Sequence, residues 1–149
     1  MIRPLYEQLT ATYGEPGNQG QLHNLITVAT PYPLKIAWDT KTTVSKITCH
    51  KSIAEDLILA MREILGFYGL KQIQALGIDL YGGCFNARPM RGSSKWSTHA
   101  WGIAFDLDPA RNQLKETAKT ARFARVEYKE MLDIFEKHGF YNQGRHKGF

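Results

Sequence analysis

The residues best suited to chemistry in this chain stand in the stretch 97–106, which reads S-T-H-A-W-G-I-A-F-D. His99 offers an imidazole and Asp106 a carboxylate, a pair common among the ligands of catalytic zinc, which takes three protein ligands and keeps a fourth position for water. Their separation in sequence corresponds to roughly 23 Å along a strand or roughly 10 Å along a helix. Since neither arrangement lets both side chains reach one ion, the chain must fold back between them. We expect Gly102 to supply the backbone angles of that turn.

Residues 103–108 alternate large apolar side chains with small or acidic ones, which is the period of a strand. Asp106 then faces away from the side on which Phe105 is buried, and Pro109 ends the strand. An interpretation without chemistry is also open: a half-buried strand with two solvent-facing aspartates, Asp106 and Asp108, and a histidine nearby by chance. Spacing alone does not decide between this interpretation and a metal site.

The elements that must position these residues follow from the hydrophobic pattern. Residues 1–33 contain many Gly, Asn, Gln and Pro and predict an irregular N-terminal arm. A capping box formed by Ser52 and Glu55 predicts the start of a helix. The other predicted elements are a short strand over 44–49, a strand over 77–85 and a second helix over 118–138. This order favours an α+β fold in which a small antiparallel sheet carries the metal site and packs against two main helices.

Three segments in roughly the second half of the chain form a combined pattern. They are S-x-H-x-x-G-x-A-x-D at 97–106, G-G-C-F-N-A-R-P-M-R-G-S at 82–93, and F-x-x-x-G-F at 135–140. Together they resemble the zinc-dependent D-Ala-D-Ala carboxypeptidase and L-alanyl-D-glutamate endopeptidase family. These peptidoglycan peptidases share the hedgehog/DD-peptidase fold, and many are phage endolysins. The resemblance implies that fold, a Zn²⁺ cofactor and hydrolysis of an amide bond in the peptidoglycan stem peptide.

The resemblance also implies a role for each matching residue. His99 and Asp106 would be zinc ligands. Arg88 would be the catalytic arginine that faces the scissile carbonyl, and Arg91 is the second match to that arginine. Arg91 and Ser97 are expected to bind the substrate.

The chain departs from the family pattern at the last motif. The family ends its site with an acid, which is the general base, and a histidine, which is the third zinc ligand, in a form such as D-x-x-H-F. No D-x-x-H follows Gly139 in this sequence. We expect both residues just beyond Phe149. His146 is a weaker alternative for the ligand because it stands too early and lacks an acid at the right spacing, and His138 is expected to cap a helix end.

Composition narrows the class of protein. The length suits one domain, 1–149, and no apolar run approaches the roughly eighteen residues of a membrane span. The net charge of +5 comes from scattered Lys and Arg with acids between them, which favours a solvated surface over a nucleic-acid interface. The start of the chain lacks the apolar core and cleavage site of a secretory signal. We therefore expect a monomer with no nucleic-acid or membrane partner, which stays in the cytoplasm until release at lysis and then acts on the cell wall.

Other functions stay open on the sequence alone. Cys84, His99 and Asp106 stand in the order of a cysteine peptidase, although no helix N-terminus is in view to lower the pKa of the Cys84 thiol. Cys49 and Cys84 are expected to be free buried thiols. A non-catalytic wall-binding module of the same fold would explain the missing last motif, and a nucleic-acid-binding domain would explain the charge but not the His–Asp pair. Within the peptidase interpretation, the sequence does not distinguish endopeptidase from carboxypeptidase, or phage from bacterial origin.

Overall fold

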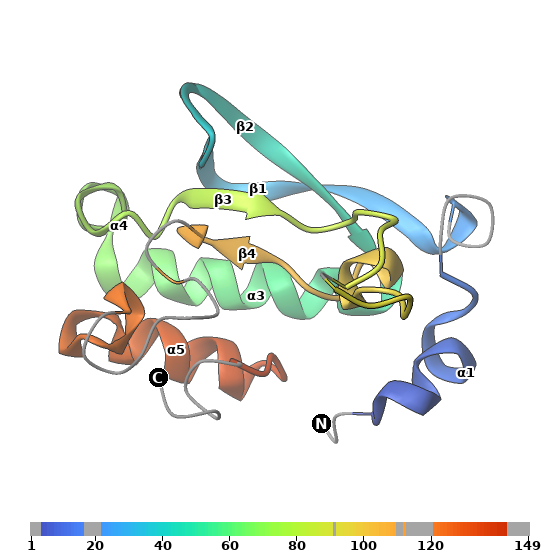
Figure 1. The fold of residues 1–149 in the computed structure, drawn as a ribbon. Helices are drawn as coiled ribbons and strands as arrows, with labels where there is room; N and C mark the ends of the chain where they lie inside the picture. The colour runs from blue at the N-terminus through green and yellow to red at the C-terminus, as the bar shows by residue number, and fades with distance from the viewer. Residues whose placement is uncertain (1–3, 17–21, 91, 110–111, 113–120, 143–149) are drawn as a thin grey trace.

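The computed structural model describes residues 4–16, 22–90, 92–109, 112 and 121–142. These residues form an α+β fold, which confirms the predicted class. The strands are β1 Leu25–Ile36, β2 Asp39–His50, β3 Leu80–Gly83 and β4 Asp106–Leu107; the helices are α1 Leu9–Tyr13, α3 Lys51–Tyr68, α4 Leu70–Leu76 and α5 Lys129–Lys137; and the 3₁₀ turns are Tyr6–Gln8, Leu22–Asn24, Thr98–Trp101, Arg122–Ala124 and Val126–Tyr128. α3 and α5 lie below the strands in Figure 1, and both helices contribute to the core under the sheet.

The four strands form one sheet in the order β2-β1-β3-β4. β1 and β2 are antiparallel, and so are β3 and β4. β1 and β3 are parallel, with Ile36 opposite Tyr81, so the predicted antiparallel sheet is corrected to a mixed one. The parallel pair arises because β2, α3 and α4 return the chain to the same end of the sheet before β3 begins, and parallel neighbours need such a crossover.

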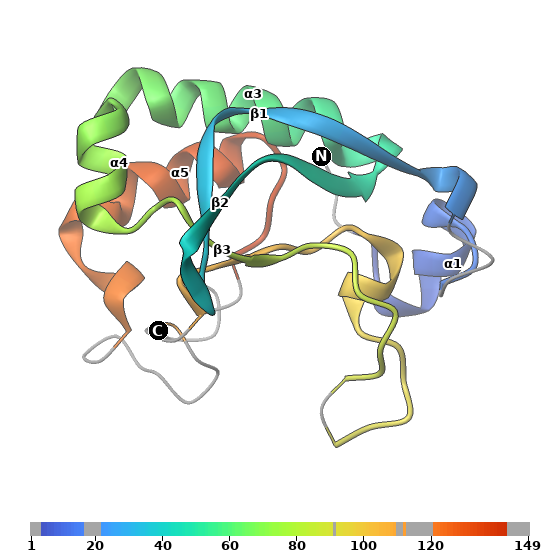
Figure 2. The ribbon, with the colours of Figure 1, turned by 90° about the horizontal axis from the view of Figure 1, so that it is seen from above.

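The β1–β2 hairpin is longer than the sequence predicted. Only residues 44–49 were expected to be a strand, whereas the hairpin pairs Leu25 with His50 and continues to Ile36 and Asp39. Its outer half is exposed on both faces over most of residues 39–46, so the apolar alternation that reveals a half-buried strand is missing there. The register shifts between Ala29 and Leu34. Figure 2 shows the hairpin bending as it crosses the molecule.

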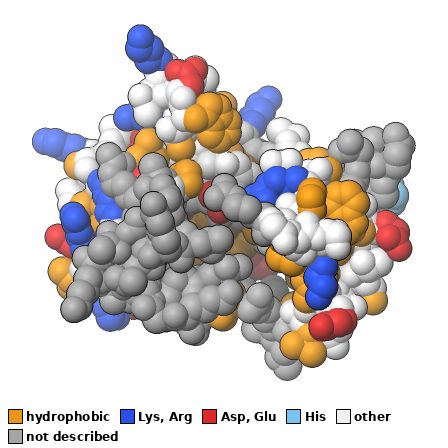
Figure 3. Space-filling model, viewed as in Figure 1, with side chains coloured by type: hydrophobic (Ala, Val, Ile, Leu, Met, Phe, Trp, Pro, Cys, Tyr) orange, Lys and Arg blue, Asp and Glu red, His pale blue; other side chains and the backbone are white. Residues whose placement is uncertain are grey.

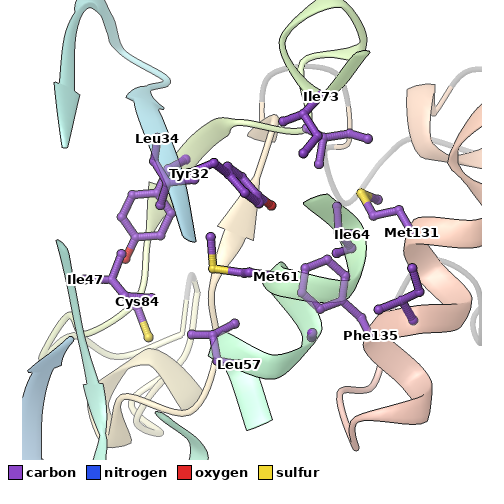
Figure 4. Close-up of a cluster of buried hydrophobic side chains, with 14 of the residues drawn as sticks. Tyr32, Leu34, Ile47, Leu57, Met61, Ile64, Ile73, Cys84, Met131 and Phe135 are labelled. Atoms are coloured by element: carbon purple, nitrogen blue, oxygen red, sulfur yellow. The ribbon is translucent and has the colours of Figure 1, made fainter. Parts of the chain in front are cut away.

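The core lies between the sheet and α3 and α5. Figure 4 shows the side chains that meet there. Leu57 and Ile64 of α3 are almost fully buried, and so is Met131 of α5. The strands, α3 and α5 thus share one apolar core, and this packing fixes where β3 lies along α3.

The N-terminal cap of α3 is His50, not the predicted Ser52. The imidazole Nδ1 of His50 accepts a hydrogen bond from the backbone N of Ser52, at 3.1 Å. The expected Ser52–Glu55 capping box therefore places the cap two residues too late, because a buried imidazole replaces the usual short polar cap. The backbone N of His50 also donates to the carbonyl of Gly102 at 2.9 Å, which ties the start of α3 to the 97–106 motif.

The predicted second helix, 118–138, is shorter than expected. Its first residues lie outside the described ones, and residues 122–128 form two 3₁₀ turns before α5 begins at Lys129. Arg122 pairs with Asp108 at 3.1 Å and donates to the Tyr128 hydroxyl at 2.6 Å. This hydrogen-bond network fixes a compact path that the apolar periodicity of residues 126–135 does not reveal. Asp108 is 2% exposed, which contradicts the alternative interpretation with two solvent-facing aspartates.

The predicted irregular arm, residues 1–33, is irregular only in part. Its described residues include a 3₁₀ turn at Tyr6–Gln8 and the short helix α1, and β1 already begins at Leu25. In both ribbon views α1 lies beside the segment that carries the motif (Figures 1 and 2). The arm is thus docked on the part of the molecule that holds the candidate ligands.

No helix among the described residues is both long and apolar enough to span a membrane. Basic side chains are dispersed over the face drawn in Figure 3, among apolar and uncharged ones. The described part of that face therefore shows no continuous basic band of the kind that follows a nucleic-acid backbone.

Candidate functional site

His99 lies in a tight turn, residues 97–102, which we call the histidine turn. The hydroxyl oxygen of Ser97 accepts a hydrogen bond from the backbone N of His99 at 3.3 Å, and so caps the 3₁₀ turn Thr98–Trp101. Gly102 then reverses the chain with φ of +73°, which confirms the predicted role of this glycine. A Cβ on Gly102 would stand 2.9 Å from the backbone N of His50, so no larger residue fits.

The fold brings His99 and Asp106 together. His99 Nε2 lies 3.4 Å from Asp106 Oδ2, with side chains 12% and 47% exposed. Two ligands bound to one zinc at about 2.1 Å with a tetrahedral angle would stand about 3.4 Å apart. The distance between these two atoms therefore already suits a shared ion, and it does so across the turn that the sequence predicted.

The second ring nitrogen of His99 is held by the main chain. Nδ1 donates a hydrogen bond to the carbonyl oxygen of Cys84 at 2.7 Å. Because a carbonyl can only accept, the neutral ring carries its proton on Nδ1 and presents the Nε2 lone pair to Asp106. Metal-binding histidines are commonly oriented in this way by a partner on the other nitrogen.

The environment of His99 raises the pKa of its ring above the usual value. Burial lowers this pKa, but the hydrogen bond with Asp106, the negative charge of that carboxylate and the hydrogen bond to Cys84 together raise it more. The positive charge of Arg88 acts in the opposite direction. A proton therefore binds well where a metal would bind, and the two compete for Nε2.

Asp106 is positioned by a close approach of β3. It stands opposite Gly83 at the start of β4. A Cβ on the preceding residue, Gly82, would lie 2.9 Å from the Cβ of Asp106 and 3.0 Å from Cγ of Pro109. Asp106 and Pro109 thus fill the space that a side chain at residue 82 would need.

Arg88 lies beside the ligand pair. Its backbone carbonyl accepts from Ser97 N at 2.9 Å, and Asn86 N donates to the carbonyl of His99 at 3.0 Å, so residues 86–88 run alongside the histidine turn. The side chain of Arg88 is exposed, and its charge acts on His99. This placement suits a cation that faces a substrate bound at the pair.

The structure does not test the remaining predictions about site residues. Arg91 and His146 lie outside the described residues. Ser97 is 5% exposed and its oxygen faces the histidine turn, so a contact of Ser97 with substrate stays a prediction. Among the described residues no three His, Cys, Asp or Glu side chains come close enough to hold a metal. The third ligand and the general base also stay predictions.

The described geometry disfavours a cysteine nucleophile. The Cys84 thiol is 3% exposed and donates to the carbonyl of Gly102 at 3.5 Å. Burial raises the pKa of Cys84, and raises that of Cys49 to about 11. A nucleophilic cysteine needs an accessible thiolate. Both cysteines are free buried thiols, as the sequence predicted, and Cys84 serves the site through its backbone carbonyl.

His138 stands at the C-terminal cap of α5, as predicted. Its ring, however, contacts Glu63 of α3, with 2.7 Å between Nε2 and Oε2. It thus joins the end of α5 to α3.

Sequence reasoning missed two contributors to the site. The Cys84 carbonyl is a main-chain group, so no residue type signals its role. Gly82 could have been found, because a glycine inside a strand often marks a close approach of another backbone.

We predict that the ring of His99 titrates with a pKa above 6.5 in the metal-free protein. Asp106→Asn should lower this pKa, because it removes the charge that favours the imidazolium. NMR titration of the His99 ring measures both values. An unchanged midpoint in Asp106→Asn would contradict the contact between the two side chains.

We predict that Gly82→Ala lowers the pKa of His99 in the same way, because the added methyl group pushes Asp106 away. Gly66→Ala is the matched control: a Cβ at Gly66, inside α3, meets no atom within 4 Å and should stabilise the helix by about 0.5–1 kcal/mol. The same NMR titration with thermal unfolding tests both variants. If the pKa of His99 is the same in Gly82→Ala as in Gly66→Ala, Gly82 does not position Asp106.

Part of the chain matches a known protein family. Residues 91–149 match the model of a family described as D-alanyl-D-alanine carboxypeptidase. No curated protein and no solved structure matches the chain. At the level of the family, the match supports a peptidase that acts on the cell wall. Over residues 91–149, which include His99 and Asp106, the chain carries the sequence pattern of the D-alanyl-D-alanine carboxypeptidase family, and this confirms the resemblance predicted from the sequence.

Proposed function

We propose that the protein is a zinc-dependent peptidase that hydrolyses an amide bond in the stem peptide of bacterial peptidoglycan. The observation that carries the proposal is the 3.4 Å contact between His99 Nε2 and Asp106 Oδ2, with His99 Nδ1 already satisfied by Cys84. The family match over residues 91–149 supplies the class of substrate.

The residues present fit a zinc ion. One neutral imidazole nitrogen and one carboxylate oxygen are typical zinc donors. His99 is well buried, whereas nearly half of the Asp106 side chain is exposed, so the pair has one sheltered side and one side open to water and substrate. Catalytic zinc sites keep such an open position. Among the described residues no third ligand joins the pair, and His146 remains a weaker candidate for that role.

Each group would contribute to amide hydrolysis in a definite way. A bound zinc activates water at neutral pH and polarises the substrate carbonyl. Cys84 holds the His99 ring in its ligating tautomer, and the backbone of Gly102 holds the turn. The exposed guanidinium of Arg88 stabilises the negative charge that develops on the carbonyl oxygen in the transition state.

A non-catalytic wall-binding module is the main alternative. A binding module needs neither a ligand pair at zinc spacing nor an exposed arginine beside it. We therefore favour the enzyme, acting as a monomer, without nucleic acid or membrane, and endolysin-like in being made in the cytoplasm and released at lysis. The alternative remains a defined outcome of the assay below.

We predict that the full-length native protein, loaded with zinc, cleaves purified peptidoglycan. Arg88→Ala should lower the rate by roughly a hundredfold or more, the effect of losing one donor to a developing oxyanion, without loss of bound zinc. Mass spectrometry of the digest identifies the bond: new amino termini after L-Ala indicate an endopeptidase, and released D-Ala indicates a carboxypeptidase. The control is Arg62→Ala, which removes an exposed arginine from α3.

Two results would count against the proposal. Intact wall peptides after incubation with the zinc-loaded native protein would favour the binding module. A normal rate for Arg88→Ala would remove this arginine from the mechanism, and the same assay on Arg91→Ala would then test the second predicted arginine.

A further inference from the structure

We propose that the N-terminal segment, residues 4–16, positions the histidine turn, and that Tyr6 is the positioning residue. The inference rests on the proposed function, because it concerns the turn that carries one of the two candidate zinc ligands. The segment lies outside residues 91–149, so the family match assigns it no role.

Tyr6 contacts both ends of the histidine turn. Its hydroxyl donates a hydrogen bond to the carbonyl of Trp96, directly before the turn, at 2.7 Å. Its ring meets the indole of Trp101, near the end of the turn, edge to face at 5.7 Å between centroids and 88° between planes. Lys95 Nζ lies 5.7 Å from the centre of the Tyr6 ring. One side chain from the start of the sequence thus bridges the two residues that flank Ser97–Ala100.

Two buried rings beside the turn depend on the same segment for hydrogen bonds. Trp101, 2% exposed, donates its Nε1–H to the carbonyl of Gly14 at 2.9 Å. His50, 4% exposed, donates Nε2–H to the carbonyl of Tyr13 at 2.8 Å. Buried donors of this kind need partners. The segment therefore supplies hydrogen bonds that the turn and its support require.

These contacts bear on the ligand distance because they add side-chain ties from residues 4–16 to the main-chain hydrogen bonds that join the turn to His50, Asn86 and Arg88. The His99 ring is fixed to Cys84, but its distance to Asp106 also depends on where the turn lies relative to β4. In both ribbon views the histidine turn lies beyond the strand arrows and beside α1 (Figures 1 and 2). Ligand sites work when their supporting residues hold them to within about 0.5 Å. A looser turn would widen the His99–Asp106 separation.

The test compares Tyr6→Phe with Tyr68→Phe in the full-length protein. Each substitution removes one hydroxyl that donates to a main-chain carbonyl, at 2.7 Å to Trp96 for Tyr6 and at 2.8 Å to Glu127 for Tyr68. Tyr68 also accepts from Met131 N at 3.0 Å and joins α3 to the start of α5, where it serves the fold alone. The measurements are thermal unfolding, the affinity for Zn²⁺ alone by competition with a chelator, and, without metal, hydrogen exchange of the Ala100 and Gly102 amides, which donate to Ser97 and His99 inside the turn.

Both variants should lose some stability, since Tyr6→Phe gives up one hydrogen bond and Tyr68→Phe gives up two. Only Tyr6→Phe should weaken Zn²⁺ binding, by about tenfold, at the low end of the range for outer partners of a metal ligand. Only Tyr6→Phe should also speed hydrogen exchange of the Ala100 and Gly102 amides, because the turn opens more often without this tie. Tyr6→Ala should enlarge both effects, since it removes the ring contact with Trp101 as well.

Equal Zn²⁺ affinity and equal amide exchange in the two phenylalanine variants would overturn the inference and leave Tyr6 a purely structural residue. A wild-type protein that binds no Zn²⁺ would instead count against the proposed function. The exchange of the Ala100 and Gly102 amides still decides the positioning role in that case, so the two failures are distinguishable.

Discussion

The hydrogen bond from His99 Nδ1 to the Cys84 carbonyl is the contact on which the site depends. It fixes the tautomer of the ring and directs Nε2 toward Asp106, which gives this His–Asp pair the geometry that we propose for two zinc ligands. The bond also joins the end of β3 to the histidine turn. The carbonyl of Gly102 adds a second tie, because it accepts from the backbone of His50 and from the Cys84 thiol. Without these main-chain contacts, the spacing of His99 and Asp106 in sequence would not fix the distance between their side chains.

The sequence predicted the turn between His99 and Asp106 better than it predicted the scaffold. No straight strand or helix lets two residues seven positions apart reach one ion, so a turn was required, and Gly102 was the residue suited to make it. The contribution of Cys84 was hidden because a backbone carbonyl has no residue signature. The outer half of the β1–β2 hairpin was missed because its Thr and Lys residues are exposed on both faces. The alternation of apolar and polar residues that reveals a strand is therefore absent there. The helix prediction was wrong for residues 122–128. The ion pair between Arg122 and Asp108 holds this segment in 3₁₀ turns, although its apolar residues recur with a helical period.

Support for the site comes from the whole chain, although the family pattern covers only residues 91–149. Tyr6, Gly14 and His50 all lie upstream of that region, yet they contact the histidine turn or its neighbours. Gly82, also upstream, makes room for Asp106. Long-range contacts of this kind are slow to form in folding because loop-closure entropy must be overcome first. They also explain why a short motif can be recognised from sequence while its geometry needs the complete domain.

The most direct test of the account is anomalous diffraction at the zinc edge from crystals of the zinc-loaded protein. The account predicts one anomalous peak about 2.0–2.2 Å from both His99 Nε2 and Asp106 Oδ2, with His99 Nδ1 still bonded to the Cys84 carbonyl. A peak bound elsewhere, or no peak at this pair with zinc in excess, would contradict the claim that the histidine turn and β4 build a metal centre.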